Sequence, residues 1–293
     1  MVDHKEHHAV LSPCHTLGGE GFDVTYLPVN KDGFVNPKDV KRVLRSDTFL
    51  ISIIYANNEI GTVEPIAEIA KVVRHHCKDG NKTYLHTDAC QAPGALSLNV
   101  AKLGVDLMTI SGSKIYGPKG IGALYIKDGI NIESLFYGGG QEGGIRSGTE
   151  NVAGIVGFGE SLVISQGMRE KESKRLTDLR NYFADALIKQ IPYVEINGSM
   201  RERLPNNLNV YIPNIESEQL VIELDAIGVA VSAGSACHSN SAGGSHVIWA
   251  ISHDSKRING SVRFTIGRST TKKDVDFVLK SLPEIFSRIK IKQ

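Results

Sequence analysis

Two serines and a lysine, Ser111, Ser113 and Lys114, lie between short apolar runs at residues 106–110 and 122–126. Both runs are typical of buried strands. A lysine at the mouth of two buried strands is costly unless its charge is removed or used. The hydroxyl groups can donate hydrogen bonds to an anion such as phosphate. The group suits a lysine that holds an aldehyde cofactor as a Schiff base, although a solvated lysine in a surface loop explains this segment equally well.

Asp88, in the string HTDACQ, is a second candidate, because it follows one predicted strand and precedes a predicted helix. A carboxylate at this position can pair with a protonated pyridine nitrogen, which turns the ring into an electron sink. It can equally be the N-cap of the helix. Gln91 could reach the same ligand or complete the cap. His7 can stack on an aromatic ring, although a histidine in a His-rich segment is more often a surface residue.

Cys237 lies in SAGSACHSNSAGGS, a loop of small residues between a predicted strand and a predicted helix. An accessible cysteine in such a loop is placed as a nucleophilic thiolate would be, and a buried structural cysteine fits these neighbours poorly. Cys90, among small residues, is expected to pack instead. Arg263 alternates with apolar neighbours in SVRFTI and can point into a cleft, where a guanidinium binds a carboxylate through two parallel hydrogen bonds. A surface ion pair is the competing interpretation.

The segments that must position these residues alternate between strand and helix. Strands are predicted at 23–27, 49–55, 84–86 and 106–110, and helices at 4–17, 65–76 and from Pro37, with Asn36 as N-cap. This order predicts an α/β domain with a mainly parallel sheet. Ligands of such sheets gather at the carboxyl ends of the strands. Asn58, Asp88 and Lys114 each follow a predicted strand, so we expect them to converge on one crevice.

A long helical pattern at residues 152–188 follows a Gly-rich loop, and we place a domain boundary in it near Gly167. Residues 1–166 then form the large domain and residues 167–293 a smaller α+β domain. Strands are expected in the smaller domain at 194–196, 208–212, 229–232 and 261–266, and a helix at 218–227. A final helix starts at Thr271, with Asp274 as its capping-box partner.

The composition bounds the class of protein. The 293 residues include 33 Lys and Arg against 32 Asp and Glu, a balance that gives no reason to expect nucleic acid or a membrane as partner. No apolar run approaches the roughly 20 residues of a membrane span, and the start of the chain has no signal-peptide core. The four cysteines are widely spaced without a CxxC pair, which suits a reducing compartment such as the cytoplasm.

Taken together, the motifs resemble those of one enzyme family. In the family's order they are EHHAVL, NNEIG, HTDACQ, SGSKIYGPKGIGALYI, GGGQEGGIRSGTEN, SAGSACHS and VRFTIGRSTT. They resemble the cysteine desulfurases of the NifS/IscS type, class V aminotransferase-like enzymes of fold type I that use pyridoxal 5'-phosphate (PLP). The resemblance spans essentially the whole chain. It implies conversion of L-cysteine to L-alanine with a persulfide on Cys237, a homodimer, and a sulfur-acceptor or iron–sulfur scaffold protein as partner.

The resemblance also implies a role for each candidate residue. The catalytic residues would be Cys237 as nucleophile, Lys114 as Schiff-base and proton-transfer residue, and His7 stacked on the cofactor ring. Asp88 would contact the pyridine nitrogen, and Gln91 and Asn58 the ring hydroxyl. Arg263 and Asn58 would bind the substrate. The phosphate would be bound by Ser111, Ser113 and Thr149, the last reaching the neighbouring subunit's cofactor.

Two departures from the family accompany this resemblance. Ser113 stands where many members have histidine, an exchange of one hydrogen-bond donor for another. The family also has a further stretch before the position that matches Met1, with the first strands of the large domain and a phosphate-binding loop. The large domain is therefore expected to be truncated at its N-terminus, and a missing eukaryotic extension could direct the protein to mitochondria. Selenocysteine lyase and a truncated, non-catalytic paralogue acting as a binding partner are the alternative functions.

Overall fold

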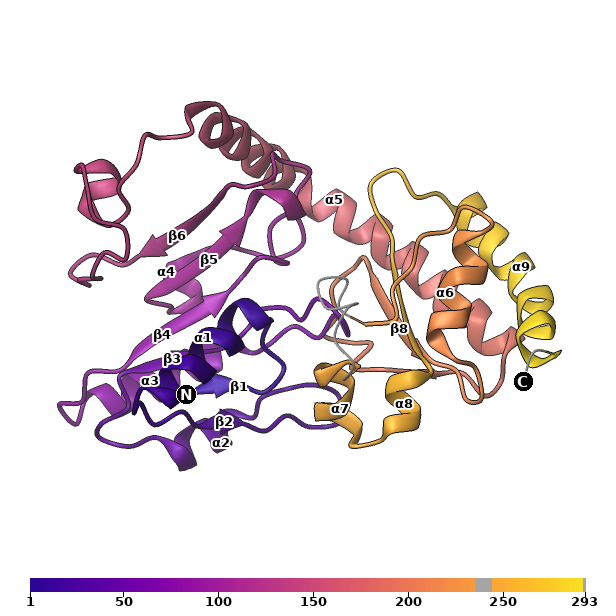
Figure 1. Ribbon diagram of the computed structural model, residues 1–293, viewed down its shortest axis with the longest axis horizontal. Coiled ribbons are helices and arrows are strands. Elements are labelled where there is room, and N and C mark those ends of the chain that lie inside the picture. The colour runs from indigo at the N-terminus through magenta and orange to yellow at the C-terminus, as the bar shows by residue number, and fades with distance from the viewer. Residues whose placement is uncertain (235–243, 292–293) are drawn as a thin grey trace.

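The structure of the chain, a computed structural model, describes residues 1–234 and 244–291, with side chains described up to residue 289. Its larger sheet has the strand order β2-β1-β3-β4-β5-β6 (Figure 1). These strands are β1 (Val2–Asp3), β2 (Tyr26–Leu27), β3 (Leu50–Ser52), β4 (Tyr84–Asp88), β5 (Leu107–Ser111) and β6 (Gly122–Ile126). Every neighbouring pair is parallel except β5 with β6. The prediction of a mainly parallel sheet in an α/β domain is therefore confirmed.

Three helices share an apolar core with this sheet and cover one of its faces: α2 (Pro37–Val43), α3 (Ile66–Cys77) and α4 (Val100–Leu103). The buried residues of α3 recur with helical spacing, at Ile66, Ile69, Ala70 and Val73. α2 begins as predicted, because the side chain of Asn36 accepts a hydrogen bond from the Lys38 backbone N–H at 2.9 Å. α1 (His8–Gly19) has no buried residue and contributes nothing to this core.

The helix α5 (Val152–Gln190) runs from the large domain into the small domain, where it packs with the second sheet (Figure 1). That sheet is antiparallel, in the order β7-β8-β9. Its strands and the accompanying helices are β7 (Glu195–Ile196), β8 (Asn207–Tyr211), β9 (Ser261–Thr265), α6 (Ser217–Asp225), α7 (His246–Ser252), α8 (Ser255–Asn259) and α9 (Lys272–Ile291). The capping box of α9 forms as predicted, with Thr271 N donating to Asp274 Oδ2 at 2.8 Å.

The boundary that we place near Gly167 stays a prediction. α5 contacts the large domain beyond that point, because Ser173 Oγ donates a hydrogen bond to Ala95 O at 3.3 Å. Its later residues Leu179, Phe183 and Leu187 are buried in the core of the small domain. None of the helices in the described ranges is both long enough and apolar enough to span a membrane.

Three local expectations differ from the structure. The strand β6 forms where predicted, but Leu124 and Tyr125 are exposed rather than buried, because β6 is an edge strand that pairs only with β5. Residues 229–232 form no strand; Val229 packs on the core of the small domain, and Ser232 makes a single bridge to Arg263. A turn follows Asp88 where a helix was expected.

Candidate functional site

The candidate site lies on the face of the large sheet opposite to the apolar core formed with α2, α3 and α4. Side chains alternate between the two faces of a strand. In β4, Leu85 points into the apolar core, so His86 and Asp88 do not share its face. The parallel register places Asp88 beside Thr109 of β5. This face therefore presents polar groups at the carboxyl ends of adjacent strands, where the sequence predicts a ligand site.

Asp88 is the last residue of β4 and is only 7% exposed. Its Oδ1 accepts a hydrogen bond from the Cys90 backbone N–H at 2.9 Å, which shapes the turn that follows the strand. The pKa of the Cys90 thiol is raised far above its ordinary value, mainly by burial and then by the charge of Asp88. Cys90 therefore stays protonated, as expected of a packing residue rather than a nucleophile.

Ser111 is the last residue of β5, and Ser113 and Lys114 lie in the short 3-10 helix Gly112–Lys114 that follows it. Ser111 Oγ lies 3.1 Å from Ser113 Oγ, so the two hydroxyl groups form one pair. Lys114 is exposed at the mouth of β5 and β6, and β6 itself is exposed rather than buried as predicted. Lys114 and Gln91 line the same cavity, which holds about 90 Å³.

Asn58 and Arg263 meet across the two domains. Arg263 Nη1, from the middle of β9, donates a hydrogen bond to Asn58 O at 3.0 Å. The half-buried guanidinium is thus directed at the turn after β3, as expected of a residue that points into a cleft. His7 is the N-cap of α1, where its Nδ1 accepts a hydrogen bond from Ala9 N at 3.1 Å. This bond orients the imidazole beside the large sheet.

Thr149 is exposed in the segment between β6 and α5, away from the ends of β4 and β5 in the sequence, and its role toward a neighbouring subunit stays a prediction. Cys237 lies outside the described residues.

Sequence reasoning did not single out a row of hydrogen-bonding side chains that crosses this face. Ser52 Oγ donates to Glu6 Oε1 at 3.0 Å and lies 2.8 Å from His86 Nδ1, and His86 Nε2 lies 2.9 Å from Thr109 Oγ1. Burial lowers the pKa of His86, which keeps its ring neutral. A neutral ring then donates from Nδ1 to Ser52 and accepts at Nε2 from Thr109. The one sequence signal for this row was that Glu6 lies next to the candidate residue His7.

Buried charges surround this row. Lys5 is fully buried, and its Nζ lies 2.6 Å from both Asp3 Oδ2 and Glu64 Oε1. Burial, followed by the charges of Asp3 and Asp88, raises the pKa of Glu6 well above its ordinary value. Glu6 Oε2 is buried and has no hydrogen-bond partner among the described residues. The raised pKa favours the protonated, neutral form of the Glu6 carboxyl group.

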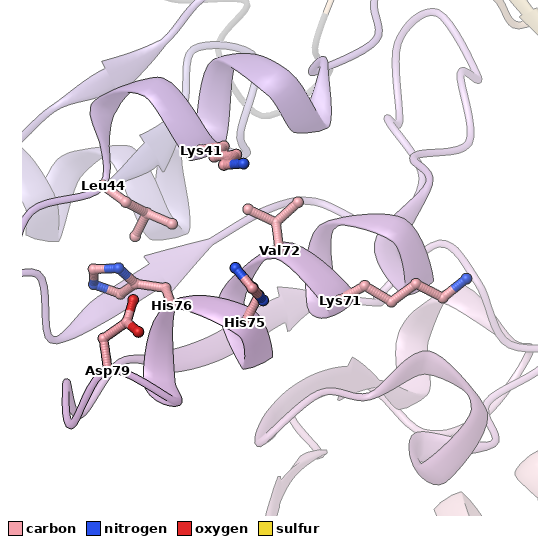
Figure 2. A pocket seen from close by; sticks show the side chains of 7 residues that line it. All are labelled: Lys41, Leu44, Lys71, Val72, His75, His76 and Asp79. Atoms are coloured by element: carbon pink, nitrogen blue, oxygen red, sulfur yellow. The ribbon is translucent and has the colours of Figure 1, made fainter.

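A separate hollow of about 400 Å³ lies between α2 and α3, on the helix-covered side of the large domain (Figure 2). Its lining is mostly basic and consists of Lys41, Leu44, Lys71, Val72, His75, His76 and Asp79. None of the predicted site residues contributes to it. The sheet separates this hollow from the candidate site.

The donor set at the sheet fits a phosphorylated pyridine aldehyde better than a metal ion. Asp88 can pair with a ring N–H, Lys114 can condense with an aldehyde, and the hydroxyl pair Ser111 and Ser113 can donate to phosphate. No cluster of three or more metal-ligating side chains occurs in residues 1–234 and 244–289. The arrangement can therefore hold PLP through residues at the ends of β4 and β5.

Residues 1–278 match the family described as aminotransferase class-V. The chain is 49% identical over 285 residues to the cysteine desulfurase IscS of Dictyoglomus turgidum, and the alignment covers 97% of this chain and 71% of that protein. It is 46% identical over 285 residues to the cysteine desulfurase IscS of Methanosarcina thermophila, with 97% and 69% of the two chains covered.

Among solved structures, the chain superposes on a NifS-like protein with a TM-score of 0.90 at 35% identity, over 98% of this chain and 74% of that chain. A structure titled "SspA in complex with cysteine" matches with a TM-score of 0.75 at 33% identity, over 90% and 72% of the two chains. These matches confirm the fold that the motifs implied.

Proposed function

Because the chain belongs to the class V aminotransferase family, we propose that it is a PLP-dependent cysteine desulfurase that acts on L-cysteine. The observation that carries the proposal is the convergence of Asp88 and Lys114 at the carboxyl ends of the adjacent strands β4 and β5. The relatives described above are named as cysteine desulfurases, which favours this reaction over selenocysteine lyase and over a non-catalytic paralogue.

In this proposal PLP is held by Lys114 and Asp88, with Gln91 and Asn58 at its hydroxyl, His7 against its ring, and its phosphate at Ser111 and Ser113. When bound, it supplies an electron sink for the electron pair left at the substrate Cα. The Arg263 guanidinium binds the substrate carboxylate, and its hydrogen bond to Asn58 O fixes its direction. Lys114, which is accessible, removes the Cα proton and returns a proton to carbon.

The sulfur transfer itself falls to Cys237, whose thiolate attacks the substrate sulfur. A sulfur–sulfur bond forms as the Cβ–S bond of the substrate breaks, and the released electron pair stays with carbon, which takes up a proton. L-cysteine and the Cys237 thiol thus become L-alanine and a Cys237 persulfide. The sulfur then passes to an acceptor, for which an iron–sulfur scaffold protein in the cytoplasm is our expectation.

The experiment is to measure alanine release and protein-bound sulfane sulfur from L-cysteine in the presence of PLP, for the wild type, Cys237→Ser and Cys90→Ser. We expect Cys237→Ser to lose both products, because a hydroxyl is far less nucleophilic than a thiolate at neutral pH. Cys90→Ser should keep both, since its thiol stays protonated. Absence of alanine from the wild type would overturn the function, and full turnover in Cys237→Ser would overturn the nucleophile.

We also propose that the active unit is a homodimer, in which Thr149 contacts the phosphate at the partner's site. Support comes from apolar side chains exposed near Thr149, in the segment between β6 and α5. Leu135 and Tyr137 are each 87% exposed, and Val152 and Val156 on the first turns of α5 are also exposed. Apolar groups gathered in this way mark an interaction surface. Sedimentation of the active species tests the proposal, and a fully active monomer would contradict it.

A further inference from the structure

The turn at residues 57–61, within the NNEIG motif, is one of the places where the two domains meet. Asn57 Oδ1 shapes the turn by accepting hydrogen bonds from Glu59 N and Ile60 N, both at 2.9 Å. Gly61 ends it with a φ of +74°, and a Cβ there would lie 2.7 Å from Asn207 Oδ1 of the small domain. Only glycine allows so close an approach in this conformation.

Strands of the small domain bind the backbone of this turn. Asn207 Nδ2 and Asn209 Nδ2, both on β8, donate to Glu59 O at 3.0 and 3.1 Å. Arg263 on the neighbouring strand β9 donates to Asn58 O, one residue earlier. Two consecutive carbonyl groups of the large domain are thus held by two adjacent strands of the small domain. The peptide that carries the predicted substrate residue Asn58 is fixed to the strand that carries Arg263.

The side chain of Glu59 reaches further into the small domain. It is only 1% exposed, and its Oε2 accepts a hydrogen bond from Ser245 Oγ at 2.5 Å. Ser245 is the N-cap of α7, where the same Oγ accepts from Ile248 N at 3.0 Å. The neighbouring residue Ile60 is fully buried against Val247 and Ile248 of that helix. The turn therefore fixes the start of α7 through one charged hydrogen bond and one apolar contact.

Gly234 brings a second part of the small domain to the same carboxylate. A Cβ on Gly234 would lie 4.0 Å from Glu59 Oε2. Ser232 Oγ donates to Gly234 O at 2.7 Å, and Ser232 pairs with Arg263 through its backbone. Gly234 and Ser245 lie on either side of Cys237 in the sequence. One buried carboxylate thus accepts a hydrogen bond from Ser245, which follows the proposed nucleophile in the sequence, and lies near Gly234, which precedes it.

We propose that Glu59 is a positioning residue for the desulfurase reaction. Its bond to Ser245 holds the flanks of the nucleophile in register with Asn58 and Arg263, and so with the large-domain site. The inference rests on the proposed function, because it assigns the reaction's nucleophile to Cys237. A purely structural link between the domains would change stability alone, whereas a positioning residue changes the reaction while the fold persists.

Two variants of Ser245 separate these roles. Ser245→Asn keeps an acceptor for the α7 N-cap and adds an amide that can donate to Glu59. In Ser245→Asp the new side chain has the shape of asparagine and caps the helix as well as asparagine does. It differs in placing a second carboxylate against Glu59. Ser252→Ala is the control on the same helix, because Ser252 Oγ donates to Ile248 O and has no contact with Glu59.

The experiment compares kcat and KM for L-cysteine, the rate at which iodoacetamide alkylates Cys237, PLP retention and the unfolding midpoint, all at one alkaline pH. We expect Ser245→Asn to stay within about twofold of the wild type, and Ser245→Asp to lose about tenfold in kcat, the loss expected for one charged hydrogen bond. PLP retention should not change in either variant. Ser252→Ala should keep its kcat.

Wild-type kcat and alkylation rate in Ser245→Asp would overturn the inference. If Ser245→Asp does not fold, Glu59→Gln replaces it: it keeps the volume and an acceptor but loses the charge, and an unchanged kcat would likewise overturn the inference. The alkylation rate does not require turnover. A wild type that releases no alanine refutes the proposed function, and the alkylation comparison still decides the role of Glu59.

Discussion

The small domain encloses an apolar core between α5, α6, α9 and its antiparallel sheet, whereas the large sheet carries buried ionisable groups on the face of the candidate site. In the small domain, Leu220, Leu224 and Leu282 are fully buried among other apolar side chains. On the large sheet, Lys5 and Glu6 occupy equally buried positions. The apolar core stabilises the small domain by burial, without directional bonds. The buried ionisable groups stabilise the large domain only while each charge keeps its partner.

This difference indicates that the face of the candidate site is built for its chemistry at a cost in stability. Buried ionisable groups cost free energy unless they are paired, and they cluster where a protein must hold charge or move protons. The row from Glu6 to Thr109 ends at the residue that pairs with Asp88 in the sheet, and Asp88 is the residue proposed to pair with the cofactor ring. The apolar core of the small domain holds no charge and moves no proton. Substitutions there should change stability alone, whereas substitutions at the large sheet should act through buried charge.

Lys5→Met should have the largest effect on stability. It removes the cation from between Asp3 and Glu64 and leaves two buried carboxylates without their counter-ion. We expect the free energy of unfolding to fall by about 3–5 kcal/mol. Lys127→Met is the matched control, because that lysine is half-exposed in its contact with Asp106 and should cost at most about 1 kcal/mol. Equal effects of the two substitutions in urea denaturation would contradict the comparison.

Leu220→Ala should come next and should act on stability alone. Leu220 is fully buried on α6 in the apolar core. Loss of its side chain should lower the free energy of unfolding by about 2–5 kcal/mol, through lost burial and the cavity left behind. PLP retention by the folded protein should be unchanged, because this core contains no residue of the candidate site. A variant that remains folded but releases PLP on dialysis would contradict the separation of the two regions.

Glu6→Gln should have a smaller effect, which depends on pH. The folded pKa of Glu6 is raised, so the stability gained from its proton is fully present below pH 4.5 and is lost as the pH rises toward the folded pKa. Gln resembles the protonated acid and does not titrate, so the variant keeps this stability as the pH rises. The stability of Glu6→Gln relative to the wild type should therefore rise above pH 4.5, by at most about 1.4 kcal/mol per pH unit. Denaturation curves across this range measure it.

The control for this titration is Glu20→Gln, at an exposed position after α1. The difference in stability between Glu20→Gln and the wild type, measured over the same pH range, is the reference for an exposed glutamate. A flat difference for Glu6→Gln would mean that Glu6 is ionised in the folded protein.

Local signals predicted much of the fold. The cap at Asn36 and the capping box of Thr271 and Asp274 form as expected, because each depends on residues within one turn of a helix. The parallel sheet followed from the alternation of apolar runs and helical patterns. The exposure of β6 did not, because it depends on what covers an edge strand, and an apolar run alone does not encode that.

Contacts between distant segments account for the rest of the site. The row of Glu6, Ser52, His86 and Thr109 joins four segments that meet only through the register of the sheet. The bond between Glu59 and Ser245 spans 186 positions of the chain. Neither residue type is unusual in its own segment, so only the fold reveals the pairing. Asp88 ends β4, and Asn58 and Lys114 follow β3 and β5 of the same sheet, while their shared role at a cofactor stays a prediction.

The central claim is that the carboxyl ends of β4 and β5 hold PLP through Lys114. Incubation with PLP, reduction with borohydride and peptide mapping tests this claim directly, because reduction fixes a Schiff base to the lysine that carries it. We predict a pyridoxyl group on Lys114 and none on Lys119, an exposed lysine in the same loop. Asp88→Asn should weaken PLP retention without moving the label. A pyridoxyl group on any lysine other than Lys114 would contradict the account.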